Sequence, residues 1–122
     1  PVTRGAGTRV ELRCPDPAAN PYLVLAVCLE AGLDGIRNQI TPPDAVTENV
    51  FEMQLPQRAK LGIESLPGDL EQAVEELEKD DYIKNVLGGH ITEKYLEAKR
   101  AEWADYRAQV TEWEIEKYLY KI

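Results

Sequence analysis

The sequence predicts a mostly α-helical chain with one or two β-strands. Apolar residues recur at helical spacing in several segments after Asn20, and residues that commonly begin or end helices flank most of these segments. Residues 8–13 are the one good strand candidate, because only there do apolar and charged side chains alternate. A single strand cannot satisfy its own backbone hydrogen-bonding groups, so we expect it to pair with a segment outside this sequence.

The composition indicates a soluble, cytoplasmic domain. The chain has 122 residues, 43% of them apolar, which is enough for one domain with a modest core. Its net charge of -8, with no continuous basic patch, disfavours nucleic acid as a partner, and the longest apolar run is too short to span a membrane. Cys14, Cys28 and His90 are too few ligands for structural zinc, and without a secretory signal we expect both cysteines to be reduced thiols.

The candidate strand places three charged side chains together. Side chains alternate along a strand, so Arg9, Glu11 and Arg13 share one face, roughly 6–7 Å apart, while Val10 and Leu12 pack on the other. A carboxylate between two guanidiniums can bridge a metal ion and anionic ligands. The same pattern is typical of the solvent-facing side of a half-exposed strand, and the residues alone leave both interpretations open.

A helix is predicted over residues 20–38. Asn20 supplies a side-chain cap, and Pro21 follows at the first helical position, where its missing N–H has no cost. The segment is apolar nearly all round, so we expect a buried helix. Gly32 and Gly35 would let another backbone approach closely.

A surface loop and a short helical turn follow. Residues 40–54 contain two consecutive prolines and no sustained periodicity, so we expect a loop held to the body by Phe51 and Met53. Residues 56–61 are expected to form one helical turn that Gly62 ends.

Residues 69–110 are predicted to form amphipathic helices. Asp69 and Asp80 are expected to cap the first two, and a longer helix over residues 91–109 follows two glycines. His90 precedes that helix without the neighbours that nucleophilic catalysis needs, so we interpret it as a helix-start residue. The longer helix is expected to bury Tyr95, Leu96, Ala98, Trp103, Tyr106 and Val110.

The last segment, residues 111–122, is predicted to be a helix that docks on another subunit. Thr111 and Glu114 have the spacing of a capping box. The apolar side chains that follow are too many for one short helix to bury against a single surface. They are Trp113, Ile115, Tyr118, Leu119 and Tyr120.

Two stretches carry a family resemblance. RVELRCPDPAANPYL (residues 9–23) and AGLDGIRN (residues 31–38) resemble the C-terminal part of the catalytic domain of bacterial type I glutamine synthetase. The likeness continues through residues 62–68, 97–99 and 105–107 and so covers nearly the whole chain. It implies that residues 1–122 are a C-terminal fragment of the α+β catalytic domain of a glutamine synthetase. It also implies ATP-dependent ligation of ammonia to L-glutamate through γ-glutamyl phosphate, with two divalent cations, Mg or Mn.

The resemblance also implies roles for the charged residues. Glu11 matches a ligand of one catalytic metal, and Arg13 matches the catalytic arginine that holds glutamate near the transferred phosphoryl group. Arg9 matches a position on the nucleotide side. The remaining metal ligands and most of the ATP site are expected to precede Pro1, so we expect this chain alone to be inactive.

The family's assembly and regulation follow from the same resemblance. It implies a homo-oligomer, a dodecamer of two hexameric rings, in which residues 111–122 reach the opposite ring. Residues 49–52 match a loop that carries a modified tyrosine in adenylylated enzymes, but Phe51 stands at that position. This difference implies the feedback-regulated branch found in Firmicutes, which glutamine and partner proteins control.

Two alternatives stay open at this stage. One is a related ligase that joins glutamate to another amine, such as a polyamine, because the amine pocket is built largely outside these residues. The other is an acidic helical interaction module, with residues 113–122 as its docking element and no catalytic chemistry.

Overall fold

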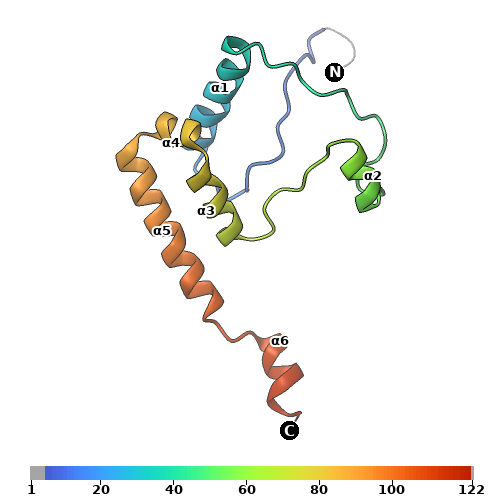
Figure 1. Cartoon of the computed structure of the whole chain (residues 1–122). Coiled ribbons are helices and arrows are strands. Elements are labelled where there is room, and N and C mark those ends of the chain that lie inside the picture. The colour runs from blue at the N-terminus through green and yellow to red at the C-terminus, as the bar shows by residue number, and fades with distance from the viewer. Residues whose placement is uncertain (1–4, 122) are drawn as a thin grey trace. The chain divides into compact units, whose positions relative to one another are not determined.

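The computed structural model describes residues 5–121, and the chain divides into two compact units, Pro1–Leu66 and Pro67–Ile122. All regular secondary structure in the described residues is helical, as predicted (Figure 1). The prediction of one or two strands is wrong for this part of the chain. Residues 8–13 form an irregular segment, because no second segment of the described chain pairs with their backbone. No helix among the described residues is both long and apolar enough to cross a membrane.

Helix α1, Pro21–Arg37, is the main element of the first unit. It begins as the sequence predicts, because the Asn20 side chain accepts hydrogen bonds from the backbone N–H groups of Tyr22 (3.0 Å) and Leu23 (3.4 Å). At the other end, the N–H of Ile40 donates to the carbonyl of Gly35 at 2.9 Å. This bond ends the helix and turns the chain into the following loop.

The burial predicted for α1 is not found. The helix has no buried residue, and Tyr22, Leu25, Leu29 and Ile36 are all more than half exposed. Their spacing places them on one face, and no other helix of this unit packs against α1. The helix therefore presents an uncovered apolar face.

The loop after α1 leads into α2, Leu55–Lys60. Met53 is buried, as predicted, and its carbonyl accepts a hydrogen bond from Arg58 Nε at 3.2 Å. Phe51 was expected to anchor the same loop, but its side chain is 90% exposed. Gly62 follows the helix with a φ of +65°, a conformation that glycine adopts without strain.

Three helices build the second unit: α3 (Leu70–Lys79), α4 (Asp81–Leu87) and α5 (Gly89–Arg107). Each of the three packs against the other two, and Figure 1 shows the long α5 running beside α3. Helix α5 begins two residues earlier than the sequence predicts, directly after the corner at Gly88, where φ is +79°. The small core of this unit lies where the three helices meet.

Fewer side chains are buried in that core than the sequence predicts. Val74 of α3 and Thr92 of α5 are buried, and the Thr92 hydroxyl donates to the Lys84 carbonyl at 3.2 Å. Tyr106 and Val110 were expected to be buried but are 67% and 71% exposed. The reason is that α3 faces only one side of α5 in this region, the side that carries Arg100, Trp103, Ala104 and Arg107, and that Val110 lies beyond the end of the helix.

The chain ends in one α-helical turn, α6 (Glu112–Glu114), followed by a π-helical stretch, η1 (Ile115–Leu119). The predicted capping box is present: Glu114 N donates to Thr111 Oγ1 at 3.2 Å, and Thr111 N donates to Glu114 Oε2 at 2.8 Å. The apolar side chains of this segment are exposed, including Trp113 at 58% and Tyr120 at 83%.

Removing the cap of α1 should destabilise that helix. The substitution Asn20→Ala takes away the acceptor of two backbone N–H groups, and we expect it to cost about 1 kcal/mol of helix stability. The measurement is urea unfolding followed by circular dichroism at 222 nm. Asn85→Ala is the matched control, because Asn85 lies inside α4 and caps no helix. Equal stability of the two variants would contradict the assigned cap.

Acidification should loosen the C-terminal helix through Glu114. Hydrogen bonds from the backbone N–H and hydroxyl of Thr111 hold the pKa of the Glu114 carboxyl below its ordinary value of 4.5. A lowered pKa means that the ionised form stabilises the fold above the unfolded-state value, and that this contribution is lost as the pH falls through the folded-state value. We expect the NMR Hα shifts of residues 115–120 to move toward random-coil values below about pH 4.5. Glu114→Gln keeps an acceptor that does not titrate, so this step should vanish in the variant.

Candidate functional site

Arg9, Glu11 and Arg13 of the first unit form one connected cluster. A nitrogen of the Arg9 guanidinium lies 3.2 Å from Glu11 Oε2, and the Arg13 guanidinium contacts the other oxygen, Oε1. Both carboxylate oxygens of Glu11 are therefore engaged, one by each arginine. Arg9 also donates to the carbonyl of Gly7 at 3.2 Å. The structure thus brings together the three residues that the sequence singled out.

Two turns flank the cluster. On the N-terminal side, Thr8 N donates to the Gly5 carbonyl at 3.0 Å, and Gly5 N donates to the Thr8 hydroxyl at 2.9 Å. On the C-terminal side, Ala18 N donates to Asp16 Oδ1 at 2.7 Å, just before the Asn20 cap of α1. The Asp16 side chain thereby starts the turn that joins the cluster to the helix.

The exposure of these side chains to solvent determines how much the ion pairs contribute to stability. The side chains of Glu11, Arg9 and Arg13 are 43%, 65% and 85% exposed. Ion pairs this exposed contribute about 0–1 kcal/mol each, so they do not hold the segment in place. The cluster has two positive charges and one negative charge. Its net charge is therefore positive and favours anionic ligands.

The opposite side of this segment does not pack as expected. Val10 is 96% exposed and Leu12 is 55% exposed, whereas the strand interpretation placed both against a core. Val10 and Leu12 could pack only if residues 8–13 were part of a sheet with a core on one side. No strand occurs in the described residues, so no such sheet is present among them. The prediction that Val10 and Leu12 pack is therefore wrong for this chain.

A metal ion would find one ligand in this cluster. Mg²⁺ and Mn²⁺ prefer oxygen ligands and take about six of them, and Glu11 offers carboxylate oxygens. No group of three or more His, Cys, Asp or Glu side chains in residues 5–121 is arranged to hold a metal ion. Glu11 fits as one ligand of such a site, and the cluster does not complete the site. Cys14 and Cys28 are free thiols.

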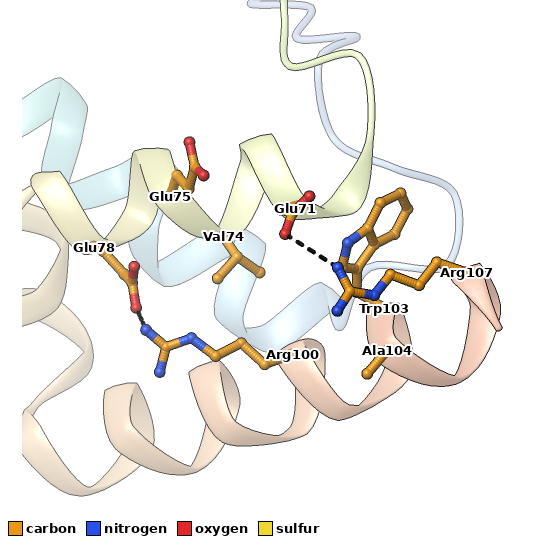
Figure 2. Close-up of a pocket in the computed structure, with 8 residues that line it drawn as sticks. All are labelled: Glu71, Val74, Glu75, Glu78, Arg100, Trp103, Ala104 and Arg107. Atoms are coloured by element: carbon orange, nitrogen blue, oxygen red, sulfur yellow. Dashed lines mark ion pairs between the residues drawn. The ribbon is translucent and has the colours of Figure 1, made fainter.

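The second unit contains a pocket that sequence reasoning missed. It has a volume of about 280 Å³ and lies between α3 and α5. Figure 2 shows two ion pairs that join these helices, Glu78 with Arg100 and Glu71 with Arg107, the latter at 3.9 Å. The eight residues that line it are Glu71, Val74, Glu75, Glu78, Arg100, Trp103, Ala104 and Arg107.

A signal for this pocket was present in the sequence. Glu71, Glu75 and Glu78 recur at helical spacing on α3, and Arg100 and Arg107 flank Trp103 at helical spacing on α5. Each set read alone indicates a solvent-facing helix. Only the contact between the two helices, which the sequence does not state, combines them into one pocket.

Comparison with known proteins gives one consistent family. Residues 1–118 match the family model described as glutamine synthetase, catalytic domain. Glutamine synthetase of Clostridium saccharobutylicum is 52% identical over 121 residues, which are 99% of this chain and 27% of that protein. The enzymes of that name from Thermotoga maritima and Methanocaldococcus jannaschii are 52% and 51% identical, over 98% of this chain.

A solved structure shows the same likeness in three dimensions. A chain of the GmaS/ADP complex, conformation 1, matches with a TM-score of 0.77 and 42% sequence identity. The match covers 88% of this chain and 24% of that one. The present chain spans about a quarter of the length of the curated relatives it matches.

Proposed function

The chain belongs to the glutamine synthetase catalytic-domain family, and on this premise we propose that it forms one wall of the active site of a glutamate–ammonia ligase. In this proposal the protein that carries the chain joins ammonia to L-glutamate and converts ATP to ADP and phosphate. The chain alone is inactive, because it contributes Glu11 but no complete metal site among its described residues.

One observation carries the proposal. Relatives named glutamine synthetase are identical to this chain at about half of the aligned positions, and the alignments span nearly the whole chain. The likeness includes the peripheral helices of the second unit as well as the segment with the charged cluster, since the aligned regions cover 98–99% of the chain. A protein that had kept only a short motif would not show this extent of similarity.

The reaction has two steps. An oxygen of the glutamate γ-carboxylate attacks the γ-phosphorus of ATP, the bond to the ADP oxygen breaks, and γ-glutamyl phosphate forms. Ammonia then attacks the γ-carbonyl carbon, phosphate leaves, and the nitrogen loses a proton to give the amide. Both steps bring anionic oxygens together, so they require positive charge that is fixed in advance.

The charged cluster supplies groups suited to these steps. Arg13 holds the glutamate substrate and neutralises negative charge near the transferred phosphoryl group, and Arg9 lies on the nucleotide side. Glu11 provides a carboxylate oxygen to one of two divalent cations, Mg or Mn, which neutralise the phosphates when bound. The two guanidiniums that contact Glu11 support this assignment, since it places anion-binding groups beside a cation ligand. A structural neighbour was solved as an ADP complex, which supports the use of a nucleotide by the protein that carries this chain.

We extend the proposal to assembly and regulation. The exposed aromatic segment at residues 113–120 docks on another subunit of a dodecamer built from two hexameric rings. Phe51 has no hydroxyl to adenylylate, which supports the feedback-regulated, non-adenylylated branch of the bacterial type I enzymes and control by glutamine and partner proteins. We place the protein in the cytoplasm, with two reduced thiols.

The two alternatives make different demands on the same residues. A ligase for another amine, such as a polyamine, would use the same cluster and differ only in which amine it accepts. A non-catalytic interaction module would not depend on Glu11 at all. Identity to glutamine synthetases of about 50% favours ammonia as the amine.

Replacing Glu11 should abolish activity without unfolding the protein. In the protein that carries this chain, we expect Glu11→Gln to lower ATP- and ammonia-dependent glutamine formation by about 100-fold or more, because a metal ligand is lost. The free energy of unfolding should change by no more than about 0.5 kcal/mol, since the ion pairs of Glu11 are exposed. Unchanged activity of the Glu11→Gln variant would favour the interaction module. Activity of the wild-type protein with a polyamine, but not with ammonia, would favour the other ligase.

Replacing Arg13 with lysine tests the substrate-holding role separately. Lysine keeps the charge but cannot bind a carboxylate through two parallel hydrogen bonds. We expect Arg13→Lys to raise the KM for glutamate about tenfold and to leave the KM for ammonia unchanged. The matched control is Arg37→Lys, at the end of α1 and outside the cluster, which should change neither value. Wild-type KM values for Arg13→Lys would refute the role.

A further inference from the structure

We propose that two side chains outside the charged cluster, Thr8 and Asp16, are positioning residues for its arginines. Thr8 fixes the direction of Arg9, and Asp16 fixes the direction of Arg13. The inference rests on the proposed function, because it concerns the groups that bind nucleotide and glutamate in that function. It goes further in assigning to each of the two side chains an effect on one substrate only.

The cluster does not hold its own geometry. Its ion pairs are exposed and contribute little to stability, and no sheet among the described residues fixes the backbone of residues 8–13. A segment without such support samples many backbone and side-chain directions. A site binds its ligand better when its charged groups are ordered beforehand. That order has to come from the segments on either side of the cluster.

A closed turn precedes the cluster. The backbone N–H of Thr8 donates to the carbonyl of Gly5 at 3.0 Å, and the Thr8 hydroxyl accepts from the N–H of Gly5 at 2.9 Å. These two bonds join the same two residues in opposite directions. The Arg9 guanidinium donates at 3.2 Å to the carbonyl of Gly7, which lies inside this turn. The Thr8 hydroxyl therefore holds in place the carbonyl that orients Arg9.

A second turn follows the cluster and leads into α1. The N–H of Ala19 donates to the Asp16 carbonyl at 3.0 Å, and the Asp16 carboxylate accepts from the N–H of Ala18 at 2.7 Å. Two residues separate Arg13 from this turn, and one of them is Pro15, whose ring fixes its φ. Little backbone freedom is therefore left between the turn and the arginine. The Asp16 carboxylate thereby links the direction of Arg13 to the first turn of the helix.

The two turns act on different arginines and so on different substrates. Arg9 lies on the nucleotide side in the proposed function, and Arg13 holds glutamate. Each arginine contacts a different oxygen of Glu11, so loosening one of them leaves the contact of the other intact. Loss of the turn at Thr8 should therefore weaken the use of ATP alone, and loss of the turn at Asp16 should weaken the use of glutamate alone. A general loss of stability would affect both substrates.

Steady-state kinetics of the protein that carries this chain test the two effects. Thr8→Val removes the hydroxyl at nearly constant shape, and we expect it to raise the KM for ATP about fivefold and to leave the KM for glutamate unchanged. Asp16→Ala should raise the KM for glutamate about fivefold and leave the KM for ATP unchanged. Thr8→Ser and Asp16→Asn keep the acceptor oxygen and should restore the wild-type values.

The matched control is Asp69→Ala. The Asp69 carboxylate also accepts from a backbone N–H, that of Gln72 at 2.9 Å, but it lies in the second unit. This variant should change neither KM. Wild-type KM values in Thr8→Val or Asp16→Ala, a rise of both KM values in one variant, or no rescue by the conservative variants would overturn the proposal.

A second measurement does not depend on activity. Arg13 Nε donates to Glu11 Oε1, so the heteronuclear NOE of the Arg13 Nε–H group reports how firmly this side chain is held. In the full chain labelled with ¹⁵N, Asp16→Ala should lower this NOE, whereas Asp16→Asn and Asp69→Ala should not. An unchanged NOE in Asp16→Ala would overturn the positioning of Arg13. Full activity of Glu11→Gln would instead overturn the proposed function, so the two failures are distinguishable.

Discussion

Backbone N–H groups at the start of a helix have no acceptor within the helix, and in this chain a side-chain oxygen supplies one at four helix starts. These caps are Asn20, Asp69, Asp80 and Thr111. Their importance follows from how little the chain buries. Its accessible surface is 10998 Å², whereas a compact protein of this mass exposes about 6,600 Å². With so little burial to favour a helix, the caps largely decide where these four helices begin.

The corner between α3, α4 and α5 shows how local bonds build the one packed region of the second unit. Lys84 donates to the carbonyl of Glu78 at 2.6 Å and pairs with Asp81 at 2.7 Å, and its own carbonyl accepts from Thr92. The last turn of α3, the first turn of α4 and the first turn of α5 are thereby tied to one residue. Because this corner fixes the angle between α3 and α5, it also sets the width of the pocket that the two helices line.

The same distinction between local and distant interactions explains what could be predicted from the sequence. Helix starts were predictable because a capping side chain and the backbone N–H groups that donate to it lie within three residues of each other, as at Asn20. The grouping of Arg9, Glu11 and Arg13 was predictable for the same reason, since alternate residues of an extended segment are neighbours. Burial failed at Phe51 and Tyr106 because it depends on segments far away in the sequence. The pocket was missed for that reason too, since its two walls come from different helices.

The other differences between prediction and structure in the first unit have a common feature, which is that two of its segments expose a side that was expected to be covered. Among the described residues, no second segment pairs with residues 8–13, and no helix of the first unit covers the apolar face of α1. Burying Tyr22, Leu25, Leu29 and Ile36 would contribute on the order of 5 kcal/mol or more, which is comparable to the whole stability of a small domain. A sheet that includes residues 8–13 and packs on α1 would cover both sides at once. It would also lift Val10 and Leu12 out of solvent and leave the charged cluster on the opposite side, where the proposed catalytic role requires it.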